Sequence, residues 1–386
     1  WAPFPLGSNR AWSMNLLSML IAACWVAWGM ATWSTPGRNW IALKPIRWPL
    51  VLGALTLTWA LLQVCSIVPE SWKPALWADA SRLMDRSLTT TISINPWRTV
   101  AECTKLASYA LILVLAFLLA RADEWAARLL NALLAITAAY SAYALALGIS
   151  GYIQYQFFYS TPPVTTGLMS GPFVSHNSYA TFTGMGSIVA AIKLTRDIGL
   201  VQVRGLDRRR STLNLLQFFF GKGAWTVLAL VLTTSTLFAS ASRAGVFATI
   251  TSLFAIVVVQ TVFQAQNAHS KWSARALSGV ILLIGLLAVV NGSVLSDRLS
   301  QLVSSGGIDE VRGALWEAGL RMIHSAPLTG FGLGTFQDAY PQFADVVMPY
   351  VVDKAHNDYL ELAAGLGLPA AGIWLLAWLW LAVRCV

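Results

Sequence analysis

The sequence predicts an all-α, polytopic membrane protein, and its composition is the first observation that does so. Of the 386 residues, 56% are hydrophobic and only 11% are charged, whereas a soluble domain carries about 25% charged residues. Apolar stretches of about 20 residues recur along the chain, and that is the length of a helix that crosses a bilayer. The 18 tryptophans fit a protein with many side chains anchored at membrane interfaces.

Nine apolar stretches are candidate spans. They lie at about 14–33, 48–68, 100–120, 129–148, 178–195, 224–241, 244–264, 276–292 and 360–383. We therefore predict a transmembrane bundle of about eight spans over 1–292, a loop domain over 293–359 and a last span over 360–386. Because the chain begins without methionine and stops directly after an apolar run, we expect further spans beyond its ends.

Basic loops set the predicted orientation. The segments 38–47, 193–222 and 271–275 are rich in lysine and arginine and fall on one side if the spans alternate. The positive-inside rule makes that side cytoplasmic, so much of the net charge of +9 is a topology signal. The three arginines at 208–210 are interpreted as a solvated loop near anionic headgroups. No aromatic stacking platform accompanies these charges, so nucleic acid is not a predicted partner.

The loop domain over 293–359 is too long for a simple connection, so we expect it to have structure and a function. Residues 308–323 predict an amphipathic helix with Val311, Leu315, Ala318 and Met322 on one face. The following stretch, 324–334, contains a proline and three alternating glycines. No strand precedes it and no Gly-Lys-Ser/Thr follows, so it is interpreted as a close-packed turn rather than a phosphate-binding loop.

Charged and polar side chains at the predicted external side are the candidates for chemistry. His356, beside Asn357, is a side chain that exchanges a proton near neutral pH. Arg243 stands at a sharp turn between two spans and needs an anion there. Arg312 has either a functional role or an ion pair with Asp309. Two external arginines and a histidine fit a diphosphate clamp with a proton acceptor.

Several other kinds of site are not predicted. The four cysteines have no metal-ligand spacing, and no His or Asp pair has it either, so we expect no metal and no cofactor. Acidic residues are almost absent from the spans, which argues against a proton-coupled carrier. Arg321 has Glu317 one helical turn before it, which favours a structural ion pair. His324 is interpreted as a cation at a helix end.

Five short motifs follow one another along the chain. They are Gly171-Pro172-Phe173 with Asn177, Ser242-Arg243-Ala244-Gly245, Arg312 with Trp316, the set Pro327, Gly330, Gly332 and Gly334, and His356-Asn357-Asp358-Tyr359-Leu360-Glu361. In this order they resemble the bacterial O-antigen ligase and O-antigen or exopolysaccharide polymerase superfamily. The resemblance implies a GT-C-like helical bundle with a large periplasmic loop domain containing short helices, in the bacterial inner membrane. It also implies a metal-independent glycosyltransferase that inverts the anomeric centre.

The resemblance further implies the substrates and the roles of residues. The donor is a glycan on undecaprenyl diphosphate, and the saccharide acceptor is either lipid A–core or a lipid-linked repeat. By position, His356 matches the family's base, and Arg243 and Arg312 match arginines that hold the diphosphate. We also predict that Asn177, Asn357 and Arg321 bind substrate. A structural His356 at a helix start, a transporter or flippase of a lipid-linked saccharide, and a membrane scaffold remain alternatives.

Overall fold

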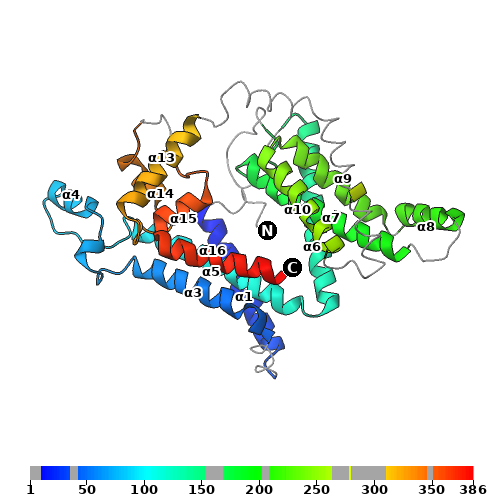
Figure 1. Cartoon of the computed structure of the whole chain (residues 1–386), viewed down its shortest axis with the longest axis horizontal. Helices are drawn as coiled ribbons and strands as arrows, with labels where there is room; N and C mark the ends of the chain where they lie inside the picture. Colours follow the sequence, from blue (N-terminus) through cyan, green and yellow to red (C-terminus); the bar gives the residue numbers. More distant parts are fainter. Residues whose placement is uncertain are drawn as a thin grey trace. The chain divides into compact units, whose positions relative to one another are not determined.

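The computed structural model describes residues 10–34, 42–152, 168–201, 208–221, 223–262, 278–279, 310–345 and 351–385. Within these ranges every regular element is a helix, which confirms the all-α class (Figure 1). The chain forms two compact units. Unit 1 contains residues 1–17 and 119–301, and unit 2 contains residues 18–118 and 302–386. The three-part division expected from the sequence stays a prediction.

Four of the predicted spans are helices long and apolar enough to cross a membrane. They are α1 (Ala11–Ala31), η2 (Lys44–Ile46) continuous with α3 (Arg47–Leu62), α5 (Pro96–Leu119) and α6 (Asp123–Ile149). Three more predicted spans coincide with α7 (His176–Val201), α9 (Ala224–Ala239) and α10 (Arg243–Val262). The predicted span 276–292 lies outside the described residues, apart from 278–279. Two short elements, η3 (Glu70–Trp72) and α4 (Leu76–Leu83), lie between α3 and α5.

The expectation of one continuous last span over 360–383 is wrong. The chain forms α15 (Asp358–Leu366) and α16 (Leu368–Cys385), which are separated at Gly367. Gly367 has φ +79°, and a Cβ there would meet the backbone of Leu328. The amide of Leu368 donates to the carbonyl of Pro327 at 2.8 Å rather than to α15. α16 then packs along α3 (Figure 1).

The interpretation of residues 208–210 as a solvated loop is also wrong, because they begin helix α8 (Arg208–Phe220). Its last residues provide the reason, since Phe218 is buried in the core of unit 1 with Leu134 and Leu230. A helix is the conformation that presents Phe218 to this core while its backbone groups are paired. α8 is bent by 66° from α9.

Small and hydroxyl-bearing residues pack the helices of unit 1. The Ser187 hydroxyl donates to that of Thr233 at 3.0 Å and so joins α7 to α9. Thr236 of α9 donates to Ser141 of α6 at the same distance. A Cβ at Gly186 would meet the side chain of Thr137, so α6 and α7 approach closely there. Small residues and interhelical hydroxyl bonds replace the hydrophobic effect as the packing force between membrane helices.

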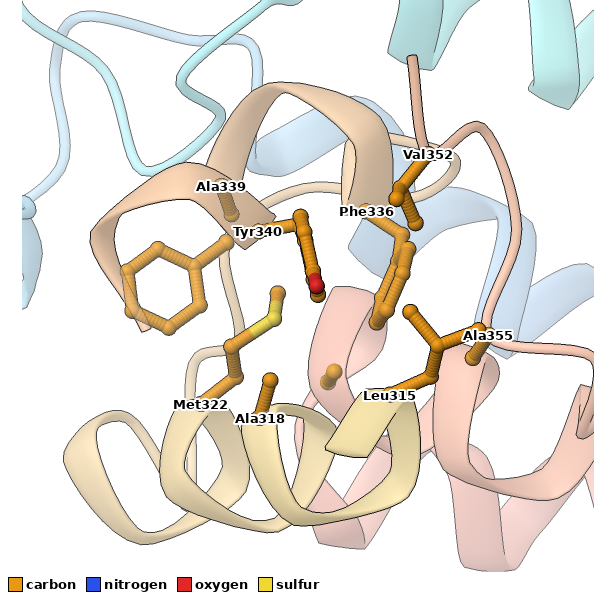
Figure 2. Close-up of a cluster of buried hydrophobic side chains, with 10 residues drawn as sticks. Leu315, Ala318, Met322, Phe336, Ala339, Tyr340, Val352 and Ala355 are labelled. Atoms are coloured by element: carbon orange, nitrogen blue, oxygen red, sulfur yellow. The ribbon is translucent and has the colours of Figure 1, made fainter. Parts of the chain in front are cut away.

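Unit 2 contains a separate apolar cluster beside the predicted site. Helix α13 (Glu310–Ser325) confirms the amphipathic helix predicted over 308–323, and Leu315, Ala318 and Met322 are buried on one face. Figure 2 shows these three side chains facing others from α14 (Phe336–Ala339), η4 (Tyr340–Gln342) and the irregular segment 351–355. One cluster therefore holds α13, the continuous stretch α14–η4 and the segment before His356 together.

The packing of unit 1 predicts the effect of Gly186→Val. The new side chain would overlap Thr137 and Thr233, and overpacking of this kind costs about 1–3 kcal/mol. We expect a lower unfolding temperature in detergent, measured by fluorescence or by loss of the monodisperse peak after heating. Gly29→Val is the control, because no atom lies within 4 Å of a Cβ there. Equal unfolding temperatures for the two variants would contradict the close approach of α6, α7 and α9.

Candidate functional site

The glycine-rich stretch after α13 is a close-packed turn, as predicted. Gly330, Gly332 and Gly334 all have positive φ, which an L side chain rarely adopts. A Cβ at these positions would meet the backbone of Gly365, the side chain of Ser93 and the side chain of Glu102, respectively. The turn therefore needs glycine for both conformation and space.

This turn also satisfies the carbonyl groups at the end of α15. The amide of Phe331 donates to the carbonyl of Ala364 at 3.0 Å, and that of Gly332 donates to Gly365 at 2.9 Å. The last carbonyls of a helix have no partner within the helix. Docking of the turn supplies partners, and α15 can therefore end inside the protein.

Gln63 joins the turn and α15 to α3. Its side chain is fully buried, and Nε2 donates to the carbonyls of Thr329 at 2.7 Å and Gly365 at 2.8 Å. Its Oε1 accepts from the amide of Leu333 at 3.2 Å. The sequence analysis missed this residue. The available signal was a glutamine in the apolar stretch 48–68, since a polar side chain in a span needs an internal partner.

His356 lies directly before α15 in a strained conformation. Its φ is +53°, in the left-handed region, and its side chain is exposed. Asn357 then caps the helix, and its Oδ1 accepts from the amides of Tyr359 at 3.2 Å and Leu360 at 3.3 Å. This is the usual role of asparagine at a helix start. Asn357 is a predicted substrate-binding residue, but its side-chain oxygen already accepts hydrogen bonds from the backbone of α15.

Glu361 ties the segment before His356 to α15. Its Oε1 lies 2.7 Å from Lys354 Nζ, and its Oε2 accepts from the amide of Ala355 at 3.3 Å. Burial by itself would lower the pKa of the Lys354 ammonium, but nearby carboxylates, led by Glu361, outweigh it and raise that pKa above its ordinary value. A raised pKa means that the Lys354 ammonium loses its proton only at strongly alkaline pH, so Lys354 is charged at neutral pH.

Arg312 shares helix α13 with Trp316, which contacts the residue before His356. It is exposed and stands one helical turn before Trp316 on α13. Trp316 Nε1 donates to the carbonyl of Ala355 at 3.2 Å, directly before His356. No ion pair joins Arg312 to another side chain that the structure describes, and Asp309, its alternative partner, lies outside the described residues. Arg312 and His356 therefore share one end of the α13–α15 contact.

Arg321 lies half a turn away from Arg312 around α13, since nine residues separate them. Its Nη1 lies 3.5 Å from Glu317, which confirms the predicted pair, and 2.6 Å from Asp345. Its Nε donates to the carbonyl of Phe343 at 3.0 Å. These contacts give Arg321 a structural task, which is to hold residues 343–345 against α13.

Asn177 and the turn that holds Arg243 are brought together in unit 1. The Ser242 hydroxyl donates to Asn177 Oδ1 at 2.7 Å and accepts from the amide of Gly245 at 3.2 Å. His176 Nδ1 lies 3.1 Å from the carbonyl of Ser240. The turn is thus docked on the first residues of α7, and the exposed Arg243 begins α10.

The predicted site residues therefore form two groups. Asn177 and Arg243 belong to unit 1, whereas Arg312, His356 and Asn357 belong to unit 2, with Arg321 on another side of α13. A helix N-terminus carries unpaired amides and a partial positive charge, so Arg243 at the start of α10 is suited to an anion. Among the described residues, no group of three or more His, Cys, Asp or Glu side chains could hold a metal ion.

Removal of the Gln63 side chain is expected to loosen the turn. Gln63→Leu leaves the carbonyl of Thr329 and the amide of Leu333 without this partner, at a cost of about 1–3 kcal/mol for each group that stays dry. The carbonyl of Gly365 keeps only its bond from the amide of Gly332. We expect a lower unfolding temperature and faster amide hydrogen exchange in residues 329–333 and 363–366, measured by mass spectrometry. Gln342→Leu, on the exposed surface of the same unit, is the control. Unchanged exchange in those two segments would contradict the role given to Gln63.

Comparison with known proteins agrees with the resemblance noted above. Residues 228–375 match the family model described as O-antigen ligase. This segment includes Arg243, Arg312, Arg321, His356 and Asn357, but not Asn177. No curated protein and no solved structure matches the chain. With its apolar helices, the chain is a multi-pass membrane protein, and its residues 228–375 are similar to the O-antigen ligase family.

Proposed function

We propose that the protein is a metal-independent, inverting glycosyltransferase of the O-antigen ligase or O-antigen/exopolysaccharide polymerase type. It moves a glycan from undecaprenyl diphosphate to a hydroxyl of a saccharide acceptor, either lipid A–core or a lipid-linked repeat. The observation that carries this proposal is His356. Within the segment that matches the family, an exposed imidazole is held in a left-handed conformation at the start of a well-packed helix. Strain of this kind clusters at functional sites.

In the proposed reaction, neutral His356 takes the proton of the acceptor hydroxyl as the oxygen attacks the anomeric carbon. The bond from that carbon to the diphosphate breaks, and the lipid diphosphate departs with the bonding electrons. Attack from the opposite face inverts the anomeric centre. General-base catalysis of this kind contributes about 10²–10⁴ in rate.

The arginines stabilise the charge that grows on the departing diphosphate. A guanidinium binds phosphate oxygens with two parallel, charge-assisted hydrogen bonds. Arg243 begins α10, whose amides add to the attraction for an anion, and Arg312 is exposed on the same side of α13 as Trp316, beside the segment of His356. These fixed charges supply electrostatic stabilisation of the transition state.

Asn177, Asn357 and Arg321 are proposed to contact the substrates, and their contacts within the protein limit how. The Oδ1 atoms of both asparagines accept hydrogen bonds from the protein. Their amide nitrogens are then the groups left for a sugar hydroxyl or a phosphate oxygen. The guanidinium of Arg321 already pairs with Asp345 and Glu317, so fewer of its N–H groups are left for a substrate.

The proposed location is the bacterial inner membrane, with membrane lipids around the apolar helices and the site facing the periplasm. The basic segments 38–47 and 193–222 support this orientation, because lysine and arginine are retained on the cytoplasmic side. In this orientation His356 and Arg243 both face the periplasm, where the acceptor is found. The architecture is proposed to be GT-C-like, with residues 293–359 as the periplasmic loop domain.

A transporter or flippase of a lipid-linked saccharide is the second candidate. The break between α15 and α16 and the 66° bend between α8 and α9 favour it, since broken helices surround the binding sites of many transporters. A transporter moves the donor across the bilayer without cleaving it. Cleavage of the donor therefore separates the two candidates.

The proposal is tested with purified protein, undecaprenyl-diphosphate-linked glycan and acceptor, in the presence of EDTA. We expect glycan transfer by the parent, and a loss of about 10²–10⁴ in rate for His356→Ala because the base is gone. Arg243→Ala is expected to be similarly inactive. His324→Ala and Arg128→Ala, at exposed positions that are not among the predicted site residues, are the matched controls.

Transfer by His356→Ala at the parental rate would remove the base assignment. Loss of transfer on addition of EDTA would overturn metal independence. If the parent transfers to no acceptor but moves the intact donor across liposome membranes, the flippase is the correct function. The anchor of the product identifies the ligase or the polymerase, because the former leaves the glycan on lipid A–core.

A further inference from the structure

The conformation of His356 has to be maintained by contacts elsewhere. Within the described residues, only Asp85, Ala241 and His356 have positive φ without being glycine. The left-handed conformation is sterically disfavoured for an L residue. His356 itself is exposed, so its neighbours in the chain must hold it.

The residue before His356 is fixed at three points. The side chain of Ala355 is fully buried in the cluster of Figure 2, beside Leu315 and Phe336. Its carbonyl accepts from Trp316 Nε1 at 3.2 Å, and its amide donates to Glu361 Oε2 at 3.3 Å. On the other side of His356, Asn357 is fixed as the cap of α15. His356 therefore lies between two residues that are each held in place by packing or hydrogen bonds.

The contact made by Glu361 differs from an ordinary helix cap. In a capping box, an acidic side chain at the third helical position returns to the amide of the cap residue. Glu361 is the fourth residue of α15 and returns to Ala355, two residues before the cap, so its bond spans His356. The Glu361 side chain is only 14% exposed, and its second oxygen is occupied by Lys354. Both oxygens thus act on the segment before His356.

We propose that Glu361 is a positioning residue for His356 and acts through the backbone of residues 354 and 355. Its carboxylate closes a loop around His356 that keeps the left-handed conformation and directs the imidazole away from α15. The effect on catalysis rests on the glycosyltransferase function proposed above, whereas the effect on the backbone does not. A catalytic group displaced by 1 Å can lose about 10² in rate.

The first test measures the backbone without any substrate. In Glu361→Ala the amide of Ala355 loses its acceptor, and we expect faster hydrogen exchange in residues 354–357, followed by mass spectrometry on the full-length protein. Glu124→Ala is the matched control, because Glu124 is an exposed partner of Arg128 in the other unit. Unchanged exchange in residues 354–357 would overturn the proposal, whether or not the protein transfers glycan.

The second test asks whether Glu361 acts through His356. In the parent background, Glu361→Ala is expected to lower kcat by about 10²-fold with little change in KM, and Glu361→Asp, whose shorter side chain cannot reach both partners, is expected to restore little. Glu361→Gln keeps an acceptor for Ala355 and is expected to recover part of the rate. Glu361→Ala is then combined with His356→Ala, and imidazole is added to the double variant to replace the missing histidine side chain.

Free imidazole does not depend on the backbone of residue 356. Glu361→Ala is therefore expected to leave the imidazole-rescued rate of His356→Ala unchanged. The effects of the two substitutions are then not additive, as is found for residues that act as one unit. An equal loss in both backgrounds would show that Glu361 acts elsewhere and would overturn the proposal. If the parent and His356→Ala transfer glycan equally well, the proposed function fails instead, and faster exchange in residues 354–357 would still establish the backbone clamp.

Discussion

A buried amide, that of Gln63, is the interaction on which unit 2 depends. It binds the carbonyls of Thr329 and Gly365 and the amide of Leu333, and thereby connects α3, the glycine-rich turn and α15. The connection is possible only because glycines let the three backbones approach one another. Since the turn satisfies the C-terminal carbonyls of α15, the helix is anchored at one end and can present His356 at the other.

Each predicted catalytic residue lies at or near the N-terminus of a helix. Arg243 begins α10, Arg312 is the third residue of α13, and His356 directly precedes the cap of α15. A cation at a helix N-terminus is disfavoured by the helix dipole unless an anion is also present. This arrangement is physically consistent with the diphosphate proposed as ligand.

Sequence reasoning and structure differ where distant residues meet. The amphipathic face of α13 was predictable, because residues three and four apart share a helix face, and Leu315, Ala318 and Met322 are indeed buried. The break at Gly367 was not, although Gly367 and Pro369 are visible in the sequence. What ends α15 is the backbone of Pro327 and Leu328, which lies about 40 residues earlier. In the sequence the run 208–210 likewise predicts a charged loop, and only the burial of Phe218 in the core explains why it is helical.

By itself the sequence determined the helical membrane class, the candidate residues and the family resemblance, because apolar length, composition and motif order are local properties. Only the tertiary structure decided how the site residues are held. The residue before the left-handed His356 is hydrogen-bonded to Trp316 and Glu361, and the turn that holds Arg243 is hydrogen-bonded to Asn177. Hydrogen bonds between segments far apart in the chain have no periodicity, so a single sequence does not reveal them.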